Sequence, residues 1–209
     1  RLQIEAVFDE LPPAAVKSGM LYSAGIIRVV VAFFRRRNRP PLIVDPVMVS
    51  TSGARLLRAS AIRLLCDELL PLATLVTPNL QEAEILAGCE LKSIEDLRRA
   101  ARAIHGRFGC AALVKGGHLR TGKEAADIFF DGKTELLLTA PFVSGVGTHG
   151  TGCTYSAAIA GFLARGRPLE KAVADAKQHI TGAILHSRAI GRHTALNPFW
   201  RLSRMRRSP

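Results

Sequence analysis

The run Pro40-Pro41-Leu42-Ile43-Val44-Asp45-Pro46 decides the fold of this chain. Its apolar centre is short, ends in a carboxylate and is bounded by prolines, which are rarely found inside a central strand. A short, continuous apolar run of this kind is typical of a strand that is buried on both faces. Such strands belong to parallel sheets that carry helices on either side, so residues 42–45 predict an α/β protein.

Outward from this strand, helical and strand patterns take turns along the chain. The predicted strands cover residues 14–20, 73–76 and 111–114, with a hairpin at 126–130 and 134–138. The predicted helices cover residues 23–37, 60–70, 80–87, 93–108, 151–165 and 168–188. This alternation predicts one domain over residues 1–200, a three-layer αβα sandwich around a mostly parallel sheet. Residues 201–209 form a basic tail.

Composition narrows the class of protein. The chain has 209 residues, 48% of them hydrophobic, which suffices for one buried core. It contains no apolar run of membrane-spanning length and no signal-peptide pattern, so we expect a cytoplasmic protein without a membrane partner. Its cysteines show no paired spacing, which argues against disulfides and metal clusters. We expect Cys66, Cys89 and Cys110 to be ordinary, half-buried side chains.

The net charge of +12 raises the question of an anionic partner. Arginines gather at residues 35–39, 98–107 and 201–207. Electrostatics alone would allow nucleic-acid binding. However, only 6% of residues are aromatic and none is interleaved with these basic runs, so stacking platforms are scarce. We therefore interpret the charge as solvated helix ends that also attract small anionic substrates.

Polar side chains follow three of the predicted strands. Asp45 ends the first, Asn79 and Glu82 follow the second, and Lys115 with two glycines follows the third. Each has an ordinary structural interpretation, as a turn residue, as helix caps or as a surface lysine. Their convergence favours a site, because ligands of parallel sheets bind at the carboxyl ends of the strands. A lysine there binds phosphate, and the carboxylates hold Mg²⁺ directly or through water.

The segment Thr148-His149-Gly150-Thr151-Gly152-Cys153-Thr154 leads into a helix of small residues. Two glycines around a threonine let consecutive backbone N–H groups point at one spot, and the helix adds the positive end of its dipole. Alone, this could be a glycine-rich helix entry without a ligand. Beside the strand-end groups, it predicts an anion hole and phosphoryl chemistry.

Taken together and in order, six segments resemble hydroxymethylpyrimidine/phosphomethylpyrimidine kinase of thiamin biosynthesis, in the ribokinase-like superfamily. They are Lys17-Ser-Gly-Met-Leu21, Asp45-Pro-Val-Met-Val-Ser-Thr-Ser-Gly53, Leu69-Leu-Pro71, Thr77-Pro-Asn-Leu-Gln-Glu-Ala83, Val114-Lys-Gly-Gly-His118 and Thr148-His-Gly-Thr-Gly-Cys-Thr154. The resemblance spans about residues 3–200. Cys153 is its most specific element, because most ribokinase-like enzymes carry Asp at that place.

The resemblance implies ATP-dependent phosphorylation of the hydroxymethylpyrimidine and of its monophosphate. Gly150, Thr151 and Gly152 would form the anion hole, and Cys153 would take the place of the catalytic base. The groups implied for ATP and Mg²⁺ are Lys115, Lys177, Asn79, Asp45 and Glu82, the last two nearest the metal. Met20 and Val47 would line the pyrimidine pocket. His149 belongs to the motif without an assigned role, and the resemblance leaves a homodimer open.

The chemistry expected of Cys153 fits two successive transfers. A helix N-terminus lowers the pKa of a thiol, whereas an incoming γ-phosphate raises it, so we expect a small thiolate fraction. A weak base suffices where the transition state is loose. An acceptor that is already a phosphate monoester needs no base, because its attacking oxygen is ionised.

The chain also departs from the family pattern. Phe142 stands where an arginine is common, residues 144–147 are unusually glycine-rich, and residues 191–200 lose part of the family's closing motif. The family's first strand, its glycine-rich segment and its pyrimidine-recognising glutamine have no counterpart. We therefore expect an N-terminally truncated domain that is nearly inactive alone.

Two other functions stay open at this stage. One is a related kinase for pyridoxal or hydroxyethylthiazole, against which the Lys17 and Val114 motifs speak. The other is a non-catalytic module that binds nucleotides or another partner.

Overall fold

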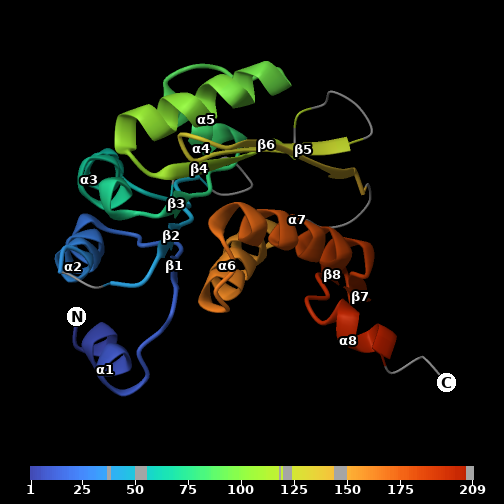
Figure 1. Cartoon of the computed structure of the whole chain (residues 1–209), viewed down its shortest axis with the longest axis horizontal. Coiled ribbons are helices and arrows are strands. Elements are labelled where there is room, and N and C mark those ends of the chain that lie inside the picture. The colour runs from blue at the N-terminus through green and yellow to red at the C-terminus, as the bar shows by residue number, and fades with distance from the viewer. Residues whose placement is uncertain (37–38, 50–55, 118, 120–123, 144–149, 206–209) are drawn as a thin grey trace.

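A computed structural model describes residues 1–36, 39–49, 56–117, 119, 124–143 and 150–205. Its centre is a six-stranded sheet in the order β1-β2-β3-β4-β5-β6 (Figure 1). The strands are β1 (Val16–Ser18), β2 (Leu42–Val44), β3 (Leu75–Val76), β4 (Ala111–Lys115), β5 (Glu124–Phe130) and β6 (Glu135–Pro141). β1 to β4 are parallel, and β5 and β6 add an antiparallel hairpin. The predicted mostly parallel sheet is confirmed.

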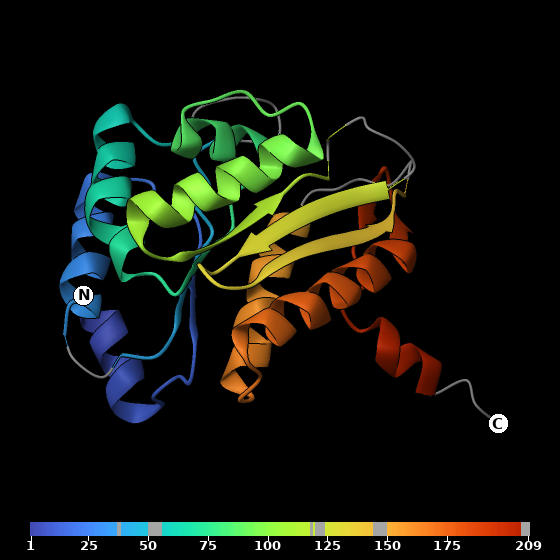
Figure 2. The same ribbon diagram turned by 45° about the horizontal axis from the view of Figure 1, so that its top comes forward.

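Helices cover both faces of this sheet, and Figure 2 shows α5 and α7 on opposite sides of it. One face carries α2 (Ala24–Phe34), α3 (Ala59–Leu64), α4 (Leu80–Ala87) and α5 (Ile94–Phe108). The other carries α6 (Thr151–Ala164) and α7 (Leu169–Leu185). Helix α3 continues through a π turn at Leu65–Leu69 and a 3₁₀ turn at Leu70–Leu72. The predicted helix at 60–70 is therefore one continuous but irregular segment.

Alternation along the strands divides the core in two. Leu42 and Val44 of β2 face the α2–α5 side, whereas Ile43 between them faces α6 and α7. Successive side chains of a strand point to opposite faces, so a strand that is apolar throughout needs helices on both. All three residues are at most 1% exposed. This is the burial that the opening sequence run predicts.

Local capping sets the helix boundaries. The Ser23 side chain accepts a hydrogen bond from the Ile26 N–H at the start of α2. Ser93 and Asp96 form a reciprocal capping box at the start of α5. Each serine satisfies an N–H that the helix would otherwise leave unpaired.

Four short elements lie outside the sequence prediction. They are α1 (Leu2–Glu10), the hairpin of β7 (Arg188–Ile190) and β8 (His193–Ala195), and α8 (Trp200–Met205). Phe8 of α1 packs against Phe33 of α2 with ring centroids 4.5 Å apart. The Trp200 indole packs over Gly182 of α7 and donates to the His179 carbonyl.

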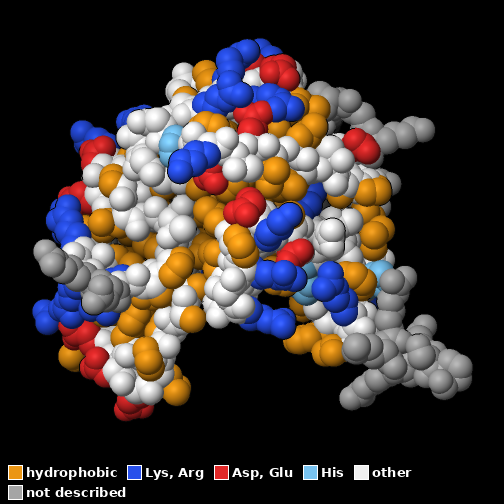
Figure 3. Space-filling view, viewed as in Figure 1, with side chains coloured by type: hydrophobic (Ala, Val, Ile, Leu, Met, Phe, Trp, Pro, Cys, Tyr) orange, Lys and Arg blue, Asp and Glu red, His pale blue; other side chains and the backbone are white. Residues whose placement is uncertain are grey.

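Among the described residues, no helix is long and apolar enough to cross a membrane. Figure 3 shows Lys and Arg side chains dispersed over one face, with Asp and Glu side chains among them. On α5, for example, Arg98 and Arg102 both pair with Glu135. Cys66 and Cys110 are buried, but Cys89 is exposed, so the expectation of three half-buried cysteines is wrong in detail.

Candidate active site

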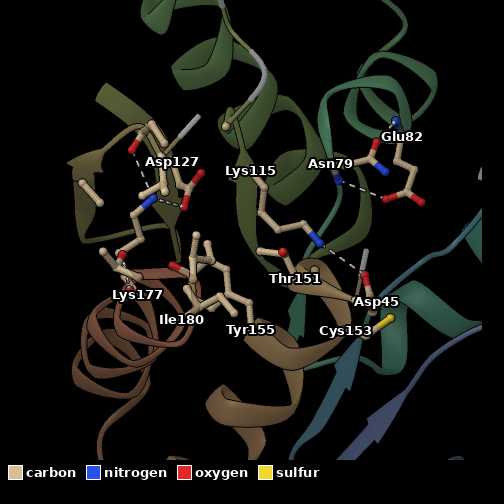
Figure 4. A pocket seen from close by; sticks show the side chains of 18 of the residues that line it. Asp45, Asn79, Glu82, Lys115, Asp127, Thr151, Cys153, Tyr155, Lys177 and Ile180 are labelled. Atoms are coloured by element: carbon tan, nitrogen blue, oxygen red, sulfur yellow. Dashed lines mark hydrogen bonds and ion pairs between the residues drawn. The ribbon is translucent and has the colours of Figure 1, made fainter. Parts of the chain in front are cut away.

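The carboxyl ends of the parallel strands open into a cavity of about 330 Å³, seen in Figure 4. Residues from the segment after β2 and from α4, β4, β5, β6, α6 and α7 meet here although they are distant in sequence. Of the residues predicted for the site, ten line it: Asp45, Val47, Asn79, Glu82, Lys115, Gly150, Thr151, Gly152, Cys153 and Lys177.

Asp45 is the electrostatic centre of one end of this cavity. Its carboxylate is 3.3 Å from the Lys115 ammonium through Oδ1 and 3.3 Å from the Lys17 ammonium through Oδ2. The Ser156 hydroxyl also donates to Oδ2, at 3.3 Å. Burial raises the pKa of the Asp45 carboxyl, but the charges of the two lysines outweigh it, so this pKa lies below its ordinary value.

Gly150 begins the turn that the sequence predicts to bind an anion. It is the N-cap of α6 and has φ +81°, a left-handed conformation that glycine adopts without strain. The first turn of α6 contains no acidic residue, so its N–H groups and dipole meet no competing charge from that turn. A Cβ atom on Gly152 would lie 3.0 Å from the Lys115 Nζ. Lys115 therefore places its ammonium group directly against the start of α6.

Cys153 lies in the first turn of α6, beside Asp45. Burial and the neighbouring carboxylate raise the pKa of the Cys153 thiol above its ordinary value, although Lys17 and Lys115 oppose them. The expected lowering by the helix N-terminus does not set the pKa of this thiol, because burial and the Asp45 charge both act on the sulfur. The thiolate fraction is thus small even without a bound phosphate.

Asn79 and Glu82 make the capping box of α4. The Asn79 side chain accepts from the Glu82 N–H at 3.0 Å, and Glu82 Oε2 accepts from the Asn79 N–H at 2.9 Å. Glu82 Oε1 accepts from the Met48 N–H at 3.0 Å, which ties α4 to the segment after β2. Burial raises the pKa of the Glu82 carboxyl despite these bonds. Asn79 and Glu82 therefore cap α4, and both side chains also line the cavity.

Lys177 enters the cavity from α7 and is held by β5. Its Nζ is 2.7 Å from Asp127 Oδ2 and 3.1 Å from the Ala125 carbonyl oxygen. Asp127 Oδ1 also accepts from the Gly116 N–H at 3.0 Å. Asp127 thus connects α7 to the lysine-glycine segment after β4. The sequence prediction did not include Asp127, whose only signal is a charged residue inside an apolar strand.

The part of the cavity by β6 and α7 is largely apolar. Its walls come from β6, α7 and the residues after β6: Ala140, Pro141, Phe142, Val143, Ile180 and Ile184. The buried Tyr155 hydroxyl and Thr151 Oγ1 have no hydrogen-bond partner among the described residues. Buried polar atoms are usually paired, so these two are candidates for bonds to a ligand.

The two residues predicted for substrate contact differ in outcome. Val47 lines the cavity and has φ +42°, a strained value for a β-branched residue that is typical of functional sites. Met20 does not line the cavity, and 54% of its surface is exposed. Met20 follows β1 and lies outside the lining of this cavity, so its place in a pyrimidine pocket stays a prediction. His149 and the glycine-rich residues 144–147 lie outside the described residues.

The carboxylates of this cavity could hold a metal ion only together with the phosphate groups of a bound substrate. Within the described part of the chain, no group of three or more His, Cys, Asp or Glu side chains could hold one. Asp45 and Glu82 both face the cavity, and each still has acceptor capacity. Mg²⁺ usually keeps several waters and joins one or two carboxylates to substrate phosphates, so this donor set fits it.

Fold and site together define an α/β protein with a lysine- and carboxylate-lined pocket at the carboxyl ends of its parallel strands. Residues 1–197 match the family model described as phosphomethylpyrimidine kinase. The chain belongs to the phosphomethylpyrimidine kinase family.

Relatives and solved structures agree with this assignment. The chain is 48% identical over 183 residues to the hydroxymethylpyrimidine/phosphomethylpyrimidine kinase of Rhizobium meliloti, covering 87% of this chain and 68% of that protein. It is 44% identical over 190 residues to the thiamine biosynthesis bifunctional protein ThiED of Geobacter sulfurreducens, covering 91% of this chain but 39% of that protein.

Among solved structures, a Bacillus subtilis pyridoxal kinase in complex with ADP has a TM-score of 0.87 at 32% identity, covering 97% of this chain and 76% of that one. A phosphomethylpyrimidine kinase from Clostridium difficile has a TM-score of 0.75 at 38% identity, covering 88% and 74%. The predicted ribokinase-like α/β architecture is thus confirmed.

Proposed function

We propose that this protein transfers the γ-phosphoryl group of ATP to 4-amino-5-hydroxymethyl-2-methylpyrimidine and then to its monophosphate, yielding the diphosphate. The observation that carries the proposal is the meeting of Lys115, Gly152 and Cys153 at the start of α6, in a cavity that is largely apolar by β6 and α7. An anion hole flanked by a lysine suits a transferring phosphoryl group. The apolar end suits a nucleobase.

In each transfer an acceptor oxygen attacks the γ-phosphorus while the bond to the β,γ-bridging oxygen breaks and ADP leaves with its electron pair. The N–H groups of Gly150 to Gly152 and the Lys115 ammonium neutralise the equatorial oxygens. With the alcohol, the proton passes to the Cys153 sulfur when ionised, or to solvent. With the monophosphate, the attacking oxygen carries no proton. Asp45 and Glu82 would hold Mg²⁺, and the ion would supply further charge neutralisation.

A second candidate activity is phosphorylation of pyridoxal. The structural likeness to pyridoxal kinases favours it, with a TM-score of 0.87 for the Bacillus subtilis enzyme. Sequence identity favours phosphorylation of the pyrimidine, since this chain is 48% identical to a kinase named for that substrate and 32% identical to the pyridoxal kinase. Acceptor preference distinguishes the two.

The test is a coupled assay of ADP release with the pyrimidine alcohol, its monophosphate and pyridoxal as separate acceptors. It is run on the 209-residue chain and on the same chain joined to the N-terminal segment of the Rhizobium meliloti relative, because this chain spans 68% of that protein. We expect acceptor-dependent turnover with the pyrimidine alcohol and with its monophosphate in at least one of the two forms of the protein. Turnover with pyridoxal alone, or with no acceptor in either form, would refute the proposal.

A further inference from the structure

Lys17 is a half-buried cation beside the site, and the proposed mechanism does not use it. Its side chain is 18% exposed, and its ammonium group is 3.3 Å from Asp45 Oδ2. A Cβ atom on Gly19 would lie 3.0 Å from the same Nζ, so the lysine folds back over the end of β1. Holding a second ammonium group on one carboxylate is costly unless another anion joins it.

Lys17 and Lys115 lie on different sides of Asp45. Lys115 pairs with Oδ1 and touches the start of α6 at Gly152, whereas Lys17 pairs with Oδ2. Two ammonium groups and one carboxylate sum to one positive charge. The cluster therefore attracts an anion on either side of the phosphoryl position at α6.

The sheet order decides which side belongs to the acceptor. β1 and β6 are the opposite edges of the sheet. The apolar end of the cavity lies by β6 and α7, and Lys17 lies on β1. A nucleotide that extends from the apolar end to the anion hole leaves the β1 side for the acceptor.

We propose that Lys17 binds the phosphate of the monophosphorylated acceptor and so favours the second transfer over the first; this rests on the function proposed above. A phosphate monoester carries about −1.5 to −2 charges near neutral pH, whereas the hydroxymethyl acceptor carries none there. Lys17 thus gains a charge-assisted hydrogen bond with the monoester only. No proton moves in that transfer: the ionised oxygen bonds to the γ-phosphorus, and ADP leaves.

The test compares both acceptors in Lys17→Met, in the two forms of the protein used above. We expect kcat/KM with the monophosphate to fall about tenfold or more, as loss of one charge-assisted bond implies, and kcat/KM with the alcohol to change less than about twofold. Lys17→Arg should keep the preference for the monophosphate. Lys171→Met, which removes an exposed lysine from α7, is the matched control and should change neither value.

Equal losses with both acceptors in Lys17→Met would overturn the assignment, because Lys17 would then only support Asp45. Calorimetric titration with the monophosphate gives a readout without turnover, and an unchanged Kd in Lys17→Met would also overturn it. If the wild-type protein turns over neither pyrimidine, the proposed function fails, while the Kd still reports whether Lys17 binds the phosphate.

Discussion

Gly152 has no side chain at the point where Lys115 meets the start of α6. Because a Cβ atom there would lie 3.0 Å from the flexible end of the lysine, we expect Gly152→Ala to displace the ammonium group without unfolding the protein. The free energy of unfolding should change by less than about 1 kcal/mol. KM for ATP should rise about tenfold, the loss of one charge-assisted contact.

Chemical denaturation and steady-state kinetics measure both effects. Gly161→Ala is the control, since it lies in the same helix and a Cβ atom there would meet nothing within 4 Å. It should gain about 0.5–1 kcal/mol of stability and keep full activity. A Gly152→Ala enzyme with unchanged KM for ATP would contradict the placement of Lys115.

Cys153 is the only candidate base in the first turn of α6. Its raised pKa makes it a weak base, so it matters only where a proton must leave. We expect Cys153→Ala to slow transfer to the alcohol about a hundredfold, the low end of general-base effects, and transfer to the monophosphate much less. Single-turnover rates with each acceptor measure this. Equal losses with both would remove the base role.

At the scale of elements, α4 and α5 begin with matching capping boxes. Asn79→Ala and Ser93→Ala each remove an N-cap side chain, and each should cost about 1 kcal/mol of stability in chemical denaturation. Of these two caps, only the cap of α4 lines the cavity. Its Glu82 side chain also accepts a hydrogen bond from the Met48 N–H. Asn79→Ala should therefore also weaken ATP binding in calorimetry. If Ser93→Ala weakens it equally, the cap has no special link to the site.

Elements were predictable where one segment carries its own signal. Leu42–Val44 is apolar and bounded by prolines, and Ser93 with Asp96 marks a helix start by local chemistry alone. Helix α1 was missed because it buries no residue fully and depends on the aromatic contact of Phe8 with Phe33. The β7–β8 hairpin was missed because its short strands are mostly exposed and lack apolar alternation.

For the whole molecule, the ionisation of Asp45 makes the free energy of unfolding depend on pH in the acid range. Its folded-state pKa lies below the unfolded value of about 3.9, so its stabilising contribution is present above that value and is lost as pH falls through the folded-state pKa. We expect urea unfolding between about pH 5 and 2 to show a steeper loss of stability in the wild type than in Asp45→Asn. Identical slopes would mean that the ion cluster does not form.

The site itself was predictable only in part. Parallel strands bring their carboxyl ends together, so the meeting of Asp45, Asn79 and Lys115 follows from the strand pattern. The pairing of Asp127 with Lys177, and of Lys17 with Asp45, depends on which strands and helices become neighbours. Sequence spacing carries no information on that.

The central claim is that one pocket performs two successive phosphoryl transfers. The most direct measurement is a ³¹P NMR time course with the pyrimidine alcohol and excess ATP-Mg, with Lys115→Met as the inactive reference. The account predicts that the pyrimidine monophosphate appears first and is then converted into the diphosphate while ADP accumulates in step. A reaction that stops at the monophosphate, or product formation that survives in Lys115→Met, would contradict it.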